Sequence, residues 1–117
     1  MKRLVSTLAA LFLCTAVSVA APKSRTFRGE IMDSQCATMG SHDQMMQKFG
    51  AKDAKECTLK CAGMGGKFVL YTAAKKATYQ LDDQEKPKEF AGQKVKVTGS
   101  YDRATKTIHV ESIEPGA

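Results

Sequence analysis

One stretch of the chain, residues 33–66, contains most of the side chains that could do chemistry. It reads DSQCATMGSHDQMMQKFGAKDAKECTLKCAGMGG and holds three of the four cysteines, Cys36, Cys57 and Cys61, together with His42. The chain has 117 residues, enough for one small domain with a single modest core. The rest of the domain must therefore fold around a long cysteine-bearing insertion.

The first twenty residues have the order of a secretory signal peptide. Two basic residues come first, an apolar run over residues 4–19 follows, and small residues end the run. The run is too short for a membrane span. We therefore expect cleavage after Ala20 or Ala21, no membrane anchor after cleavage, and a periplasmic or extracellular location. Residues 21–25 would form a flexible lead-in.

Export bears on how the cysteines are used. Cys14 lies in the apolar run and would be removed with it. Exported proteins meet an oxidising environment in which exposed thiols tend to pair. Three cysteines remain, which is an odd number, so one thiol must stay free, pair with another molecule or bind a metal. The formal net charge of +6 is spread along the chain, which favours solubility and does not indicate a nucleic-acid surface.

Outside the insertion the sequence predicts β-structure. Apolar and polar residues alternate in each of five short segments, as they do in strands with one buried face. The last of these segments places Ile113 on the wrong face, which predicts a bulge or strand end near Ser112. Gly29, inside the first segment, predicts a bend or a close backbone approach. The five segments are Thr26–Met32, Lys67–Tyr71, Ala77–Leu81, Gln93–Tyr101 and Thr107–Ile113.

Two helices are expected inside the insertion. The first would begin at Ser41 as N-cap and end at Gly50 in the left-handed conformation. The second would begin at Asp53 with Glu56 as its capping partner, and it would place Cys57 and Cys61 on one face. A further short helix, begun by a proline, is expected over residues 87–90.

These elements predict a mainly β (α+β) fold. The order matches a small five-stranded OB-like barrel, with the two-helix insertion between strands 1 and 2 and the short helix between strands 3 and 4. A five-stranded open meander is the competing topology, because periodicity does not reveal strand pairing. We expect a single domain over residues 26–114, with the insertion at 33–66 and a loose tail at 115–117.

The chain resembles a family of small exported bacterial proteins. The pattern is G-x-I-x-D-x-x-C, then a helical stretch ending in C-x-x-x-C, a G-K-F-V-L strand and a late A-G-x-K-V-x-V-T-G strand. The resemblance implies export and an OB-like barrel in an uncharacterised domain, and it implies no activity. The matching residues are Gly29, Ile31, Asp33, Cys36, Cys57, Cys61, Gly66 to Leu70 and Ala91 to Gly99.

Three interpretations of the cysteines remain open. In the leading one, a disulfide from Cys36 to Cys57 or Cys61 constrains the insertion, a contribution on the order of 3 kcal/mol, and the third thiol is inert. A disulfide between Cys57 and Cys61 is disfavoured because residues four apart in a helix do not meet disulfide geometry. In the second, the three thiolates and His42 bind zinc, or copper because several methionines lie nearby. In the third, a free thiol exchanges with the disulfide.

No motif of a known enzyme class occurs in the chain. It has no G-x-S-x-G, H-E-x-x-H, phosphate loop or EF-hand pattern, so no catalytic residues are assigned. We therefore expect a non-enzymatic binding or structural module. Its partner would be a small ligand or a protein, and export argues against nucleic acid.

Overall fold

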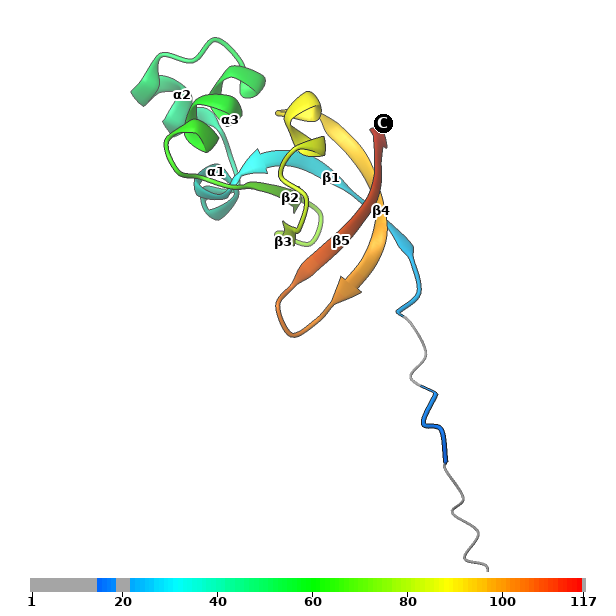
Figure 1. Ribbon diagram of the computed structural model, residues 1–117. Coiled ribbons are helices and arrows are strands. Elements are labelled where there is room, and N and C mark those ends of the chain that lie inside the picture. Colours follow the sequence, from blue (N-terminus) through cyan, green and yellow to red (C-terminus); the bar gives the residue numbers. More distant parts are fainter. Residues whose placement is uncertain (1–14, 19–21, 117) are drawn as a thin grey trace, which may run out of the picture.

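The computed structural model describes residues 15–18 and 22–116, and they form a mainly β fold of five strands and three α-helices. Figure 1 shows the strands as one strongly curved sheet, with the helices gathered beyond one end of it. The strands are β1 (Arg25–Asp33), β2 (Phe68–Thr72), β3 (Ala77–Leu81), β4 (Lys94–Asp102) and β5 (Thr107–Pro115). The helices are α1 (Ser34–Met39), α2 (Asp43–Phe49) and α3 (Ala54–Gly63), with a 3₁₀ helix η1 (Lys86–Phe90).

The sheet closes on itself. Hydrogen-bonded pairing runs in the order β1-β2-β3-β5-β4 and returns to β1, which pairs with both β2 and β4. All of these pairs are antiparallel except β3 with β5, whose parallel contact is short and joins Gln80 to Thr107 and Leu81 to Ile108. The closure rests on this short contact, because within the described residues the rest of β5, residues 109–115, pairs with β4 alone.

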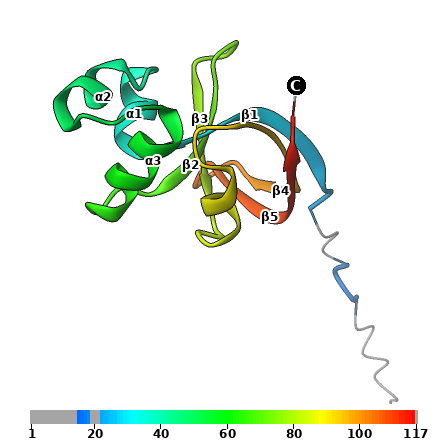
Figure 2. The ribbon, with the colours of Figure 1, turned by 90° about the horizontal axis from the view of Figure 1, so that it is seen from above.

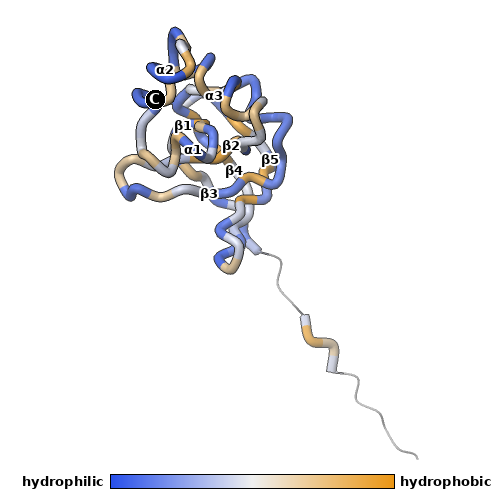
Figure 3. Tube along the Cα trace, turned by 90° about the vertical axis from the view of Figure 1, so that its left-hand side faces the viewer, coloured by the Kyte–Doolittle hydropathy of each residue, from blue (hydrophilic) through white to orange (hydrophobic). Residues whose placement is uncertain are grey.

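The alternating residues of the strands fill the interior of this closed sheet. Its buried core consists of apolar side chains from every strand, with Phe27, Tyr79 and Tyr101 packed against them. Figure 3 shows hydrophobic colour along the strands and hydrophilic colour on the outer loops and turns. The buried members are Ile31, Phe68, Leu70, Leu81, Ala91, Val95, Val97 and Ile108.

The insertion holds three α-helices where the sequence predicted two. Helix α1 was missed because Asp33, expected only to end the strand, caps a helix that begins directly after it. Helix α2 begins one residue after His42, and Ser41 accepts a hydrogen bond from the Asp43 amide instead of acting as N-cap. The predicted N-cap of α3 is confirmed, since Asp53 accepts from the Glu56 amide at 2.8 Å. The Glu56 carboxylate, however, accepts from the Lys52 amide and not from that of Asp53, so the expected reciprocal cap is only half formed.

The helices lie together at one end of the sheet. Figures 1 and 2 both show α1, α2 and α3 grouped beyond the end of β1, away from the carboxyl end of the chain. They cover the last residues of β1, where Ile31, Met32 and Asp33 are all buried although successive residues point to opposite faces. Alternation with one buried face would leave Met32 facing solvent, but Met32 is buried because the insertion packs on that face.

A bulge in β5 explains the side on which Ile113 lies. Thr98 pairs with Ser112, and Gly99 pairs with Val110, so Glu111 is the additional residue. This confirms the irregularity expected near Ser112, and it returns Ile113 to the core. Only glycine fits at position 99, because a Cβ atom there would overlap the carbonyl group of His109 on the neighbouring strand. Gly29 meets the Tyr71 carbonyl in the same way, which confirms the close approach expected there.

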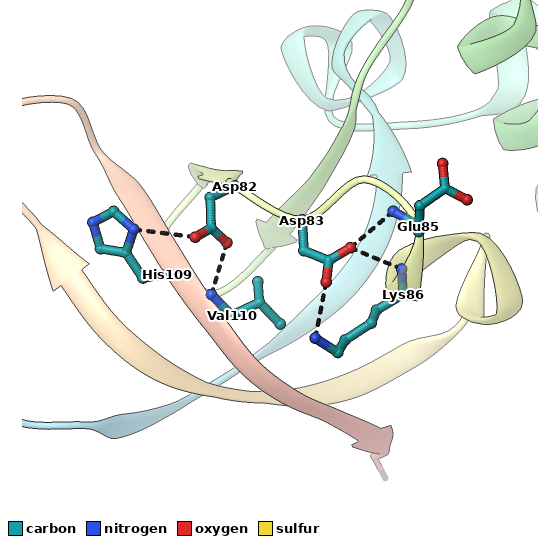
Figure 4. A network of polar contacts seen from close by, with 6 residues as sticks. All are labelled: Asp82, Asp83, Glu85, Lys86, His109 and Val110. Carbon is teal, nitrogen blue, oxygen red and sulfur yellow. Dashed lines mark hydrogen bonds and ion pairs between the residues drawn. The ribbon is translucent and has the colours of Figure 1, made fainter.

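Aspartates after β3 attach that strand to its neighbours (Figure 4). The Asp82 carboxylate accepts a hydrogen bond from the Val110 amide at 2.8 Å, and its other oxygen lies 3.1 Å from Nδ1 of His109. The Asp82 bonds supplement the short parallel contact between β3 and β5. Asp83 accepts from the amides of Glu85 and Lys86 and so attaches η1 to the end of β3.

The ends of the chain differ in how much of them the structure describes. Most of the predicted signal peptide, residues 1–14 and 19–20, lies outside the described residues. At the other end, β5 continues to Pro115 and the Gly116 amide donates to the Lys94 carbonyl at 2.9 Å, so the expected loose tail is partly paired. Among the described residues there is no helix of the length and apolar character needed to cross a bilayer.

Candidate metal centre

The insertion has its own small core, built on cysteine. Cys36 from α1 and Cys57 and Cys61 from α3 are at most 1% exposed. Met32 of β1 and Val69 of β2 are buried in the same cluster, and Met45 and Met46 pack against it. The three sulfurs therefore converge under the helices, where β1 ends.

Local structure explains how Cys36 reaches this position. Asp33 caps α1, with its Oδ2 atom accepting from the amides of Gln35 at 2.9 Å and Cys36 at 3.1 Å. This bends the chain back toward the sheet as soon as β1 ends. Gly40 closes the helix with a φ of 71°, and the chain then turns so that His42 returns to the same cluster.

The donor atoms form two groups of three, and each group is compact enough to hold one ion. The Sγ atoms of Cys36 and Cys57 are 3.8 Å apart. One ligand atom from each of Cys36, His42 and Cys57 falls within 4.8 Å of the other two, and so does one from each of Asp33, Cys36 and Cys61. The four residues expected to bind metal therefore come together as two overlapping groups, with Cys36 in both.

The sulfur separation agrees with metal coordination. Two thiolates bound at about 2.3 Å with a tetrahedral angle between them lie about 3.8 Å apart. Two protonated thiols in van der Waals contact would have a similar separation. Support for a metal site therefore comes from polar atoms that lack hydrogen-bond partners.

His42 presents one nitrogen to a hydrogen-bond partner and keeps the other free. Its Nε2 atom lies 2.7 Å from Oε1 of Glu30, and the hydrogen bond to Glu30 raises the pKa of the imidazole above its ordinary value despite the opposing effect of burial. The residue is only 8% exposed, and its Nδ1 atom is buried without a hydrogen-bond partner. Metal-binding histidines have this arrangement, in which a carboxylate holds the nitrogen that the metal does not use.

Two further buried oxygens lack partners. Oδ1 of Asp33 and Oγ1 of Thr58 are buried without a hydrogen bond, and both residues are 0% exposed. A buried polar atom without a partner costs on the order of 1–3 kcal/mol. Asp33 and His42 each belong to one of the two donor groups, so two of the three unpartnered atoms belong to candidate ligands, which an apolar disulfide-bonded core would not require.

Burial suppresses ionisation of the free thiols. Burial is the main reason that the pKa of Cys36 is raised far above its ordinary value, and the neighbouring Asp33 carboxylate adds to the effect. Burial likewise raises the pKa of Cys61 to about 11. Reactive cysteines are usually accessible and have a lowered pKa, so these features argue against the thiol-exchange interpretation.

The predicted disulfide is not formed in this structure. Cys36, Cys57 and Cys61 are all free thiols, and Cys36 and Cys57 are in contact without a bond. Of the methionines expected near the site, Met45 and Met46 pack against the cluster, whereas Met39 and Met64 are exposed. The sequence did not predict that Glu30 belongs to the site. Alternation along the strand places Glu30 on its polar side, where a side chain is expected to face solvent.

The similarity found with a known protein family covers most of the sheet and none of the candidate metal ligands. Residues 63–116 match a family model described as a protein of unknown function (DUF5818). The matched region spans β2 to β5 and includes none of Cys36, His42, Cys57 and Cys61. No curated protein and no solved structure matches the chain with significant similarity. The similarity covers four of the five strands and assigns no activity.

Proposed function

We propose that this protein is an exported metal-binding module whose insertion holds a thiophilic transition-metal ion, zinc or copper(I). Cys36, Cys57 and His42 would supply two sulfurs and one nitrogen, and Cys61 or Asp33 lies beside Cys36 as a fourth donor. The observation that carries the proposal is the buried Nδ1 atom of His42, which has no partner while Glu30 holds Nε2. Because no group in the cluster is placed to act on a substrate, the module is proposed to bind and not to catalyse.

The chemistry of the donors narrows the choice of metal. Thiolate and imidazole ligands suit zinc and copper, whereas calcium and magnesium require mostly oxygen ligands. A closed, buried set of four ligands would favour zinc in a structural role. The apolar surroundings, with Met32 buried in the cluster and Met45 and Met46 packed on it, favour copper(I).

Titration of the reduced protein with each ion tests the proposal. We expect one equivalent of zinc or copper(I) to bind, with protons released as the thiols become thiolates, and to raise the melting temperature. Cys36→Ser should abolish binding because Cys36 belongs to both donor groups. Binding that is absent, or that is unchanged in Cys36→Ser, would contradict the proposal. Met39→Leu is the matched control, since Met39 is exposed outside the cluster.

A disulfide between Cys36 and Cys57 is the second candidate. Its support is the contact between the two sulfurs at 3.8 Å and the oxidising environment that export would bring. The protein would then be a stapled binding module with Cys61 as an inert thiol. Mass measurement of the unreduced protein distinguishes the two, because the staple requires a loss of about 2 Da whereas the metal form keeps three reduced thiols.

We also propose export and an OB-like barrel architecture for the module. Export is supported by the signal-like order of residues 1–20, and a mature chain that begins at Ala21 or Pro22 would be the direct evidence. The architecture is supported by the closed order β1-β2-β3-β5-β4 with η1 between β3 and β4. Cross-strand proton contacts between β3 and β5 in solution, measured by NMR, would test the closure.

A further inference from the structure

A hollow of about 520 Å³ opens on the sheet among β1, β3, β4, the end of β5 and the turn between β2 and β3. Three of its lining side chains are basic, Arg28, Lys75 and Lys96, and one is acidic, Glu114. Neither the residues of the two donor groups nor Glu30 line this hollow. The hollow is therefore a separate feature from the candidate metal centre.

Two of the basic residues face each other across a strand pair. Arg28 of β1 lies directly opposite Lys96 of β4 in the antiparallel register. Like charges in directly opposite positions destabilise a sheet. The next pair on the same face, Glu30 with Lys94, has opposite charges. The Arg28–Lys96 pair is thus unfavourable, whereas the neighbouring Glu30–Lys94 pair is favourable. An anion bound between Arg28 and Lys96 would turn their repulsion into two attractive contacts.

Few negative charges of the protein balance the positive charges of the hollow. Glu114 lies opposite Lys96 on the other neighbouring strand, so one carboxylate faces three cations. Within residues 22–116, no ion pair is formed by Arg28, Lys75 or Lys96. Thr26 and Thr98 also face each other beside the basic pair and line the hollow, which adds hydroxyl groups that can donate hydrogen bonds to an oxyanion.

An aromatic wall lies next to these charges. Phe27 and Tyr79 pack against the core inside the sheet and also line the hollow, with ring centroids 5.3 Å apart and the rings tilted by 57°. Neither ring is fully buried. Binding pockets typically combine such apolar surfaces with a few polar groups that fix orientation.

We propose that this hollow binds a small ligand that carries an oxyanion on an aromatic body. The phosphate, sulfate or carboxylate group lies between Arg28 and Lys96, where Arg28 can bind two of its oxygens at once. The ring lies against Phe27 and Tyr79.

The test uses phenyl phosphate with the whole protein at low salt. We expect saturable binding by calorimetry and a rise in melting temperature. Lys96→Gln should weaken binding by about tenfold. Lys94→Gln is the matched control. It removes one positive charge from the same face of the same strand outside the hollow, and its affinity should stay within about twofold of the original.

Three outcomes would overturn the inference. One is no saturable binding up to concentrations on the order of 10 mM. Another is equal weakening by Lys96→Gln and Lys94→Gln, which would mean general charge attraction. The third is equal affinity for phenyl phosphate and inorganic phosphate, which would remove the role given to the aromatic wall. None of these results depends on metal binding, because the two sites share no residue.

Discussion

The Nε2 atom of His42 lies 2.7 Å from the Oε1 atom of Glu30 and so links the insertion to β1. This contact fixes which ring nitrogen remains for the cysteine cluster, and it is the only polar side-chain contact recorded for His42 in the described part of the chain. We therefore expect Glu30 to act on the candidate metal centre by positioning His42.

Replacement of Glu30 should weaken the metal centre without removing a ligand. Loss of an outer carboxylate typically costs 10- to 100-fold in metal affinity, so we expect Glu30→Gln to raise the dissociation constant for zinc or copper(I) by about that factor. Competition with a chelator of known affinity measures the change. Glu89→Gln, at an exposed position in η1, is the control and should bind as tightly as the original protein. An unchanged affinity in Glu30→Gln would refute the positioning role.

The cysteine cluster should also matter to stability in the metal-free protein. Cys36 is 0% exposed, whereas Met39, three residues later in the same helix, is 41% exposed. We expect Cys36→Ala to lower the free energy of unfolding by about 1–2 kcal/mol and Met39→Ala to change it by no more than about 0.5 kcal/mol. Urea denaturation under reducing conditions compares the two variants. Equal midpoints would show that the cluster contributes no packing energy.

Gly99 should tolerate no side chain. A Cβ atom at Gly99 would overlap the His109 carbonyl in the middle of the β4–β5 pair, whereas a Cβ atom at Gly63, at the end of α3, would meet nothing within 4 Å. We expect Gly99→Ala to destabilise the protein by about 1–3 kcal/mol or more and Gly63→Ala to be neutral or slightly stabilising. Thermal unfolding of both variants tests this. A stable Gly99→Ala protein would mean that the bulge can move along β5.

Asp82 should make part of the stability depend on pH. Burial alone would raise its pKa, but the hydrogen bonds from Val110 and His109 outweigh that effect and lower the pKa below its ordinary value. A carboxyl with a lowered folded-state pKa contributes stability above its unfolded pKa and loses that contribution as the pH falls through the folded-state pKa. We expect a loss of about 0.5–1 kcal/mol on acidification, reduced by the exposure of the pair.

The Asp82→Asn variant isolates this contribution. It should be less stable than the original protein at pH 7, and the difference should shrink as the pH falls below about 4. Urea denaturation as a function of pH provides the measurement. Glu85→Gln removes an exposed carboxylate that pairs with Lys88 and should show a much smaller difference. A difference between Asp82→Asn and the original that stays constant with pH would contradict the assignment.

Periodicity predicted the strands well because each strand buries one face. All five expected strands exist, within two residues at each end, and the bulge near Ser112 was visible as a change of alternation at Ile113. Helix α3 was predictable from the local capping of Asp53. Helix α1 was not, because Asp33 ends a strand and caps a helix at the same position, and local patterns do not distinguish these roles.

The sequence by itself determined which groups could form a site: three cysteines within residues 33–66, one histidine among them, and helical spacing that puts Cys57 and Cys61 on one face. Only the tertiary structure decided that Cys36 touches Cys57, that Glu30 holds His42, and that Arg28 opposes Lys96. The physical reason is that these pairs join segments far apart in the chain. Their distances follow from strand register and helix packing, which residue periodicity does not specify.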